Sequence, residues 1–166
     1  MDGVPTRTLI ILRHAKAANP DGVVDEQRPL SPRGQRDAAA AGGWLVDHGY
    51  QPDVVLCSPA RRTKQTWHGV AGALPRAPEV SYVERLYAAG LPDLLDAVAD
   101  VSDDAQVVLL IGHNPALSQL SALLDPTGAD AEGLSTSGIA VHSWQGDWSD
   151  AGAGTAPMTA SHTARG

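Results

Sequence analysis

The sequence has no Phe, a single Cys and an aromatic content of only 4%. A folded core must therefore consist mainly of Leu, Val, Ile and Ala, and the hydrophobic content of 43% is ordinary for a globular chain. The single cysteine, Cys57, cannot form an internal disulfide. The apolar run at residues 9–12 is too short for a signal-peptide core, so these features together predict a cytoplasmic protein.

Long hydrophobic runs and an excess of positive charge are also missing. The longest later apolar run, residues 107–111, is far below the ~20 residues needed to cross a bilayer, which argues against a membrane segment. The chain has 12 Lys and Arg residues against 19 Asp and Glu, giving a formal net charge of −7. This balance argues against a broad nucleic-acid surface but is compatible with a local cationic pocket. A length of 166 residues suits one domain.

Short apolar stretches of strand length recur along the chain. Four of them predict buried strands and a fifth predicts a last strand, in the order 8–12, 54–57, 80–83, 107–111 and 139–144. Helical signals lie between these runs. Strands that alternate with helices predict an α/β layer fold with a mostly parallel sheet, because right-handed crossovers return each new strand in the same direction.

The helix signals are capping residues followed by proline. The Ser-Pro pair at residues 31–32 predicts the start of a helix that ends near Gly49. The Ser-Pro pair at 58–59 and the Asn-Pro pair at 114–115 repeat this signature, each directly after a predicted strand. From residue 146 to residue 166 the sequence is small, polar and without periodicity. We therefore expect one domain over residues 1–145 and a flexible C-terminal tail over residues 146–166.

Polar residues follow each of the four buried runs directly. In chain order, these residues are Arg13 and His14 after the first run, Ser58 and Arg62 after the second, Glu84 after the third, and Gly112 and His113 after the fourth. The carboxyl ends of parallel strands share one edge of a sheet, and ligands of open α/β sheets bind there. Helices that begin at this edge also point their N-terminal amides at it, which favours an anion. The sequence therefore predicts a phosphate site.

These residue types suit phosphoryl transfer through a covalent intermediate. A neutral imidazole of His14 would attack phosphorus and form a phosphohistidine that water later hydrolyses. Arg13, Arg62 and His113 would stabilise the charge that develops on the phosphoryl oxygens. Glu84 would protonate a leaving oxygen if burial raised its pKa. We expect no metal and no other cofactor, because arginines beside the histidines would repel a cation and no carboxylate pair accompanies them.

Four motifs in order resemble those of the histidine phosphatase superfamily. They are the Arg-His pair at residues 13–14, the stretch LSPRG at 30–34, the stretch SPARRTKQT at 58–66 and the Gly-His pair at 112–113. The resemblance implies a single-domain, three-layer, phosphoglycerate mutase-like α/β fold with a mostly parallel central sheet. It also implies that His14 is the nucleophile and that Arg62, rather than Arg61, binds phosphate.

Within that superfamily the chain is similar to the short phosphohistidine phosphatases of the SixA type. The similar residues are the R-H-A-K opening at 13–16 and the D-x-x-R-P-L-S stretch at 25–31. Mutases usually have Gly after the Arg-His pair, whereas this chain has Ala15. The chain is also too short for the insertions that form a specificity lid in other members, and an open site would suit a phosphate carried by a protein.

Several of these residues have a structural alternative. Arg28 and Ser31 could both contact the phosphate. Alternatively, Ser31 only caps a helix. His113 could cap the turn that follows it, and Glu84 beside Arg85 could form a surface ion pair of little energetic value.

Three functions follow for such a site. The first is hydrolysis of phosphohistidine in a partner protein, and the second is hydrolysis of a small phosphorylated metabolite. They differ in the leaving group, because an alkoxide needs a general acid and an imidazole does not. The third is a phosphate-binding module without catalysis, against which the presence of His14 and both arginines argues.

Overall fold

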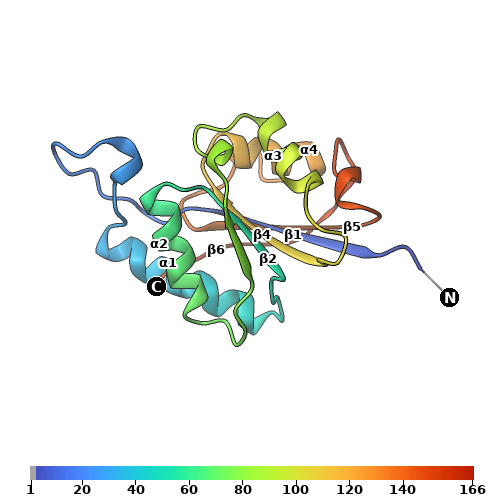
Figure 1. Cartoon of the computed structure of the whole chain (residues 1–166), viewed down its shortest axis with the longest axis horizontal. Coiled ribbons are helices and arrows are strands. Elements are labelled where there is room, and N and C mark those ends of the chain that lie inside the picture. The colour runs from blue at the N-terminus through green and yellow to red at the C-terminus, as the bar shows by residue number, and fades with distance from the viewer. Residues whose placement is uncertain (1–2) are drawn as a thin grey trace.

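A six-stranded sheet forms the middle layer of the computed structural model, which describes residues 3–166 (Figure 1). The strand order is β3-β2-β4-β1-β5-β6. The strands are β1 (Thr6–Arg13), β2 (Val54–Cys57), β3 (Glu79–Tyr82), β4 (Val107–Gly112), β5 (Gly138–Gln145) and β6 (Met158–Thr163). β1, β2, β3 and β4 run parallel, whereas β5 pairs antiparallel with β1 and β6 antiparallel with β5. The prediction of a mostly parallel α/β sheet is confirmed.

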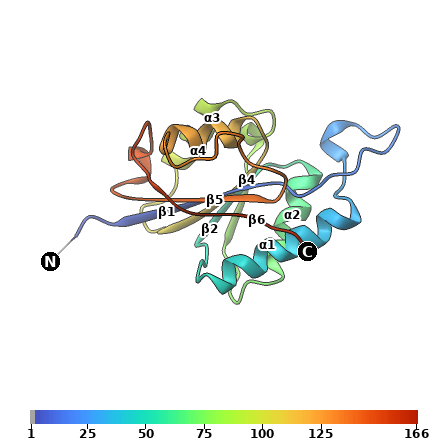
Figure 2. The ribbon, with the colours of Figure 1, turned by 180° about the vertical axis from the view of Figure 1, so that it is seen from behind.

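Helices cover both faces of this sheet. They are α1 (Pro32–Asp47), α2 (Arg61–Ala71), α3 (Leu91–Ala99) and α4 (Ala116–Leu124). In Figures 1 and 2, α1 and α2 lie on one face, and α3 and α4 lie on the other. The three-layer architecture is therefore as expected. Within residues 3–166, no helix is both long enough and apolar enough to cross a membrane.

Alternation along β1 divides the core into two layers. Leu9 and Ile11 belong to the cluster that packs with α3 and α4, whereas Ile10 and Leu12 belong to the cluster that packs with α1 and α2. All four side chains are fully buried. Successive side chains of a strand point to opposite faces, so a continuous apolar run is the pattern expected of a central strand covered on both sides.

The structure confirms the cap of α1 and shifts the starts of α2 and α4. Ser31 is the N-cap of α1, and its Oγ accepts a hydrogen bond from the backbone of Gly34 at 3.0 Å. α2 begins at Arg61 rather than Pro59, because Ala60 is its extended N-cap residue. α4 begins at Ala116, one residue after the predicted proline.

The third predicted strand is in place but is not buried. It forms the edge strand β3 (Glu79–Tyr82), whose residues are exposed or half-buried. The chain after β3 forms the short 3-10 helix η2 (Glu84–Leu86) and then α3. At the start of α3, the backbone of Gly90 donates a hydrogen bond to Asp93 Oδ2 at 2.9 Å. The apolar residues of the 80–83 run gave no sign of this edge position.

The expectation of a flexible tail after residue 145 is wrong. Residues 146–166 contain the 3-10 helix η3 (Trp148–Asp150) and β6, which pairs antiparallel with β5. Trp148 is 1% exposed and donates from Nε1 to the carbonyl of Ala105 at 2.9 Å. Ala156 and Ala164 are fully buried. The small residues of this segment pack closely against the rest of the fold, so its composition alone led to the wrong prediction of flexibility.

Replacing Trp148 by Ala tests whether this segment is part of the folded core. We expect the Trp148→Ala variant to lose about 3–5 kcal/mol of unfolding free energy, the usual loss for removing a buried aromatic ring. Urea denaturation followed by circular dichroism measures the loss. Ser149 is exposed and adjacent, so Ser149→Ala should change the free energy by less than about 0.5 kcal/mol. Equal effects of the two substitutions would contradict the packed arrangement.

Candidate active site

The register between β1 and β4 brings the polar residues to one level at the edge of the sheet. Arg13 lies opposite Gly112, and the backbone of His14 donates to the carbonyl of Gly112 at 3.1 Å. The backbone of Ser58, which follows β2, donates to the carbonyl of Ile111 at 3.1 Å. These bonds align the ends of three neighbouring strands. The convergence predicted from the sequence is therefore present for the residues after β1, β2 and β4.

His14 is held in one tautomer. Its Nδ1 lies 2.7 Å from the carbonyl oxygen of Ala15, and this oxygen can only accept, so Nδ1 carries the proton and donates it. Thr66 Oγ1 accepts from the backbone N–H of Ala15 at 3.0 Å and helps to hold this residue in place. Nε2 is left with its lone pair. The geometry suits an imidazole that reacts through Nε2.

The same imidazole is uncharged at neutral pH. Burial lowers the pKa of His14 to about 4, helped by the positive charges of Arg62, Arg13 and Arg28 and opposed by the hydrogen bond to Ala15. A proton on Nε2 would occupy the lone pair that attacks phosphorus. The surrounding arginines thus attract a phosphate and also keep the nucleophile available.

His113 faces His14, with their ring centroids 5.4 Å apart. Its Nε2 lies 2.8 Å from Ser58 Oγ, and Ser58 Oγ also accepts from the backbone of Ala60 at 3.4 Å. The Ser58 hydroxyl can donate to Nε2, and the proton of the neutral ring is then on Nδ1. Burial lowers the pKa of His113 to about 3, with further contributions from His14 and Arg62.

Two buried nitrogens of the site have no hydrogen-bond partner among the described residues. They are Nδ1 of His113 and Nε of Arg13. Buried polar atoms are normally paired, and an unpaired donor indicates a place for a ligand or an ion. Arg13 is fixed from its other end, because its Nη1 donates to the carbonyl of Leu134 at 3.0 Å. Both free donors suit the oxygens of a phosphoryl group.

Arg62 is buried, at 7% exposure, whereas Arg61 is exposed. Nη1 of Arg62 donates to the carbonyl of Asp25 at 2.8 Å, and Nη2 donates to Asp25 Oδ2 at 3.1 Å. Successive residues of a helix diverge by about 100°, so only one of the two arginines can face the site. The expected choice of Arg62 over Arg61 agrees with their burial.

Sequence reasoning missed Asp25 and Tyr87. Asp25 begins the short 3-10 helix η1 (Asp25–Gln27) in the loop between β1 and α1, and it accepts hydrogen bonds from Arg62, Arg28 and Tyr87. Tyr87 lies edge-on to His113, with 5.9 Å between the ring centroids. The D-x-x-R spacing that carries Asp25 was visible in the sequence. Tyr87 lies just after η2 and follows no predicted strand directly, so the pattern of apolar runs did not indicate it.

Ser31 and Arg28, which were expected near the phosphate, use most of their hydrogen bonds within the fold. The Ser31 hydroxyl accepts from Gly34 as the cap and donates to the carbonyl of Lys16 at 3.1 Å, so its hydrogen-bonding capacity is used within the fold. Arg28 donates from Nε to the carbonyl of Ala18 and from Nη1 to Asp25, and its charge acts on His14.

Glu84 is exposed and has no hydrogen bond to the site among the described residues. The burial on which a general-acid role depended is therefore absent. The surface alternative is also different from the one expected, because Arg85 pairs with Asp100 at 3.0 Å rather than with Glu84. The chain that follows β3 brings Tyr87, not Glu84, to the histidines.

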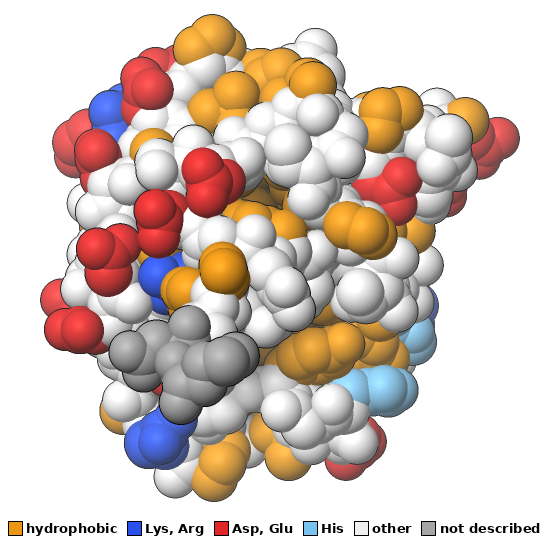
Figure 3. Space-filling view, turned by 90° about the vertical axis from the view of Figure 1, so that its right-hand side faces the viewer, with side chains coloured by type: hydrophobic (Ala, Val, Ile, Leu, Met, Phe, Trp, Pro, Cys, Tyr) orange, Lys and Arg blue, Asp and Glu red, His pale blue; other side chains and the backbone are white. Residues whose placement is uncertain are grey.

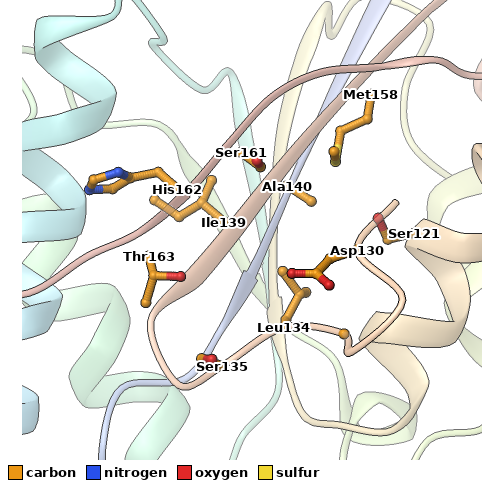
Figure 4. Close-up of a pocket in the computed structure, with 11 residues that line it drawn as sticks. Ser121, Asp130, Leu134, Ser135, Ile139, Ala140, Met158, Ser161, His162 and Thr163 are labelled. Carbon is orange, nitrogen blue, oxygen red and sulfur yellow. The ribbon is translucent and has the colours of Figure 1, made fainter. Parts of the chain in front are cut away.

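Two cavities lie near these residues. One, of about 240 Å³, borders His113 and Asn114 and is otherwise lined mostly by apolar side chains that include Leu86 and Leu94. The other, of about 280 Å³, lies between the loop after α4 and the strands β5 and β6 (Figure 4). In Figure 4 the ring of His162 points away from this second cavity, and it stacks on Trp44. None of the predicted site residues lines the second cavity.

Charge is distributed unevenly over the molecule. Arg13, Arg28 and Arg62 gather at the carboxyl edge of the parallel strands, although the whole chain carries a net charge of −7. Figure 3 shows the opposite edge, where acidic side chains outnumber basic ones. In residues 3–166, no three or more His, Cys, Asp or Glu side chains are grouped so that they could hold a metal ion.

Comparison with known proteins agrees with this geometry. The family model "Histidine phosphatase superfamily (branch 1)" matches residues 9–89. An uncharacterized protein of Mycobacterium tuberculosis is 41% identical over 162 residues, which cover 93% of this chain and 100% of the relative. The chain belongs to the histidine phosphatase superfamily.

Two further relatives carry the SixA name. Phosphohistidine phosphatase SixA of Escherichia coli is 31% identical over 134 residues, covering 80% of this chain and 82% of that protein. The solved structure of a protein from Nakamurella multipartitia with the same name has a TM-score of 0.86 and 34% identity, and the match covers 98% of this chain and 99% of the other. The resemblance to SixA-type proteins is confirmed, and with it the prediction that the chain is a phosphatase.

The low pKa values of the two histidines can be measured directly. We expect the imidazole signals of His14 and His113 to titrate near pH 4 and pH 3 in an NMR titration, well below the ordinary value of 6.5. The His14→Gln variant assigns the first signal by its loss. Because the unfolded chain takes up these protons first, stability should fall as the pH drops from about 6.5 towards 4. A midpoint near 6.5 for His14 would contradict the neutral nucleophile.

The adjacent arginines offer a matched pair of variants. We expect Arg62→Ala to lower kcat/KM by about 10²-fold, as is common when one fixed donor to a reacting group is removed. The loss in Arg61→Ala should be at least about ten times smaller than the loss in Arg62→Ala, because the side chain of Arg61 is exposed to solvent. Steady-state kinetics on one phosphorylated substrate measures both losses. Equal losses would mean that the helix faces the site in a different register.

Proposed function

We propose that the chain hydrolyses phosphohistidine in a partner protein through a covalent phosphohistidine intermediate on His14. The observation that carries the proposal is the fixed tautomer of His14, which leaves the Nε2 lone pair free beside unpartnered donors. In the first step, Nε2 forms a bond to phosphorus while the bond to the leaving nitrogen breaks. In the second step, water attacks the phosphorus and releases His14 and inorganic phosphate.

The donors around His14 would stabilise the phosphoryl group in both steps. Arg13 Nε and His113 Nδ1 are unpaired and would bind two of its oxygens, and Arg62 would contribute a further donor and charge. Arg28 would act mainly through its positive charge. Because these groups are fixed before the substrate binds, they need not reorganise during the reaction. No step of this route uses a metal ion.

Two observations favour a phosphoramidate over an ester. Hydrolysis of an ester with a poor leaving group needs a proton donor for the departing oxygen, and Glu84 is exposed and makes no hydrogen bond to the histidines. A protonated imidazole leaves without such a donor. The name phosphohistidine phosphatase, which both SixA relatives carry, supports the same substrate class. A small phosphorylated metabolite is the second candidate, supported by the apolar cavity beside His113.

A hydrolysis panel with the wild-type protein and His14→Ala tests the proposal. The wild type should hydrolyse a histidine-phosphorylated protein with a kcat/KM at least about tenfold above that for phosphomonoesters. The reason is that no side chain of the site is placed to protonate the departing oxygen of an ester. His14→Ala should lose turnover on all substrates and keep its circular dichroism spectrum, because no other nucleophile is available. Rapid quenching with labelled substrate should trap phosphate on His14.

Other results would contradict particular parts of the proposal. Label on a different residue, or wild-type turnover by His14→Ala, would refute the covalent mechanism. Faster hydrolysis of a phosphomonoester than of phosphohistidine would instead support the metabolite phosphatase.

A further inference from the structure

The Asp25 carboxylate lies among the arginines of the phosphate site. Oδ2 accepts from Arg62 Nη2 at 3.1 Å and from the Tyr87 hydroxyl at 2.6 Å, and Oδ1 accepts from Arg28 Nη1 at 3.2 Å. A carboxylate offers about four acceptor positions, so three partners leave one position free, on Oδ1. The side chain is 53% exposed. Asp25 is thus fixed in place and still accessible to a bound molecule.

This carboxylate is also close enough to influence the histidines. Tyr87, which donates to Asp25, lies edge-on to His113, and Asp25 is among the charges that act on His113. A negative charge at this place weakens the attraction of the arginines for any phosphate. A role in phosphate binding alone therefore does not explain a carboxylate here.

The carboxylate remains ionised at neutral pH. The hydrogen bond from Tyr87 lowers the pKa of Asp25 to about 2, with further lowering by Arg28 and Arg62 and opposition from partial burial. An ionised carboxylate can accept a hydrogen bond but has no proton to donate. Asp25 cannot replace Glu84 as a proton donor for an ester oxygen.

We propose that Asp25 determines the substrate class by accepting a hydrogen bond from the protonated ring that carries the phosphoryl group, so that it favours phosphorylated nitrogen bases such as imidazole over phosphate esters. This inference rests on the proposed function and adds to it a residue that selects the substrate. Asp25 would distinguish the two substrate classes through its negative charge beside the leaving group.

The chemistry differs between the two substrate classes. In a phosphoimidazole that is protonated on its second nitrogen, the ring is a cation whose N–H can donate to Asp25. When His14 Nε2 bonds to phosphorus, the electron pair of the broken P–N bond passes to the ring, which leaves as neutral imidazole and keeps its proton. Asp25 stabilises the protonated form from which this departure occurs.

An ester presents the opposite charge to Asp25. When its P–O bond breaks, the electron pair passes to the oxygen, which leaves as an anion unless a proton is supplied. The ionised carboxylate repels that developing charge. The same residue thus promotes one reaction and opposes the other, which a residue that merely holds Arg62 in position would not do.

Asp25→Asn tests this inference, because it keeps the size of the side chain and removes its charge. We compare kcat/KM for N-phosphoimidazole and phenyl phosphate, two small aromatic substrates whose leaving atoms are nitrogen and oxygen. We expect a loss of about 10- to 100-fold on N-phosphoimidazole, the scale of one hydrogen bond to a charged group, and little change or a gain on phenyl phosphate. The ratio of the two kcat/KM values is the decisive measurement.

Two further variants serve as controls. Asp21→Asn removes an exposed carboxylate of the same loop and should leave the ratio unchanged. Tyr87→Phe removes a hydrogen bond to Asp25 but keeps its charge, so it should affect both substrates to a similar degree.

The possible failures are distinguishable. Equal losses on both substrates in Asp25→Asn would overturn the inference and reduce Asp25 to a residue that positions Arg62, while the proposed function would stand. If the wild-type protein hydrolysed phenyl phosphate through His14 but hydrolysed neither N-phosphoimidazole nor a histidine-phosphorylated protein, the proposed function itself would fail. An unchanged ratio with unchanged rates would also overturn the role of Asp25.

Discussion

The hydrogen bond from the backbone of His14 to the carbonyl of Gly112 sets the level at which β1 and β4 end. The site is built on that level. The parallel register places Arg13 opposite Gly112, and the same alignment carries His113 to within 5.4 Å of His14, measured between ring centroids. A shift of either strand by one residue would turn these side chains to the other face of the sheet. The buried apolar residues of both strands prevent such a shift, so the hydrophobic core determines the geometry of the catalytic edge.

The electrostatic character of the site follows from burial and from the arginines together. Removal from water favours the neutral form of both histidines, and the arginines oppose protonation in the same direction. An anion therefore meets fixed positive charge from side chains that do not lose their protons, while the imidazoles keep their lone pairs. Asp25 modifies this field without cancelling it, since it is one carboxylate among Arg13, Arg28 and Arg62.

The sequence allowed prediction of those features that depend on local order along the chain. The α/β class, the cap at Ser31 and the placement of Arg13, His14, Arg62 and His113 follow from apolar runs and the residues next to them. Residues 146–166 were misjudged because β6 is stabilised by pairing with β5, a contact that composition does not reveal. Glu84 was overvalued because its position after an apolar run implied burial, whereas β3 is an edge strand. Asp25 lies in a loop, and two of its three partners, Arg62 and Tyr87, are far from it in the sequence.

Two buried donors without partners, Nδ1 of His113 and Nε of Arg13, have a consequence for how the molecule can evolve. A buried donor without an acceptor costs about 1–3 kcal/mol, and an anion bound at both nitrogens would supply the acceptors. Selection for stability alone would replace such residues by apolar ones. Retaining both donors therefore favours readiness to bind an anion over stability of the fold.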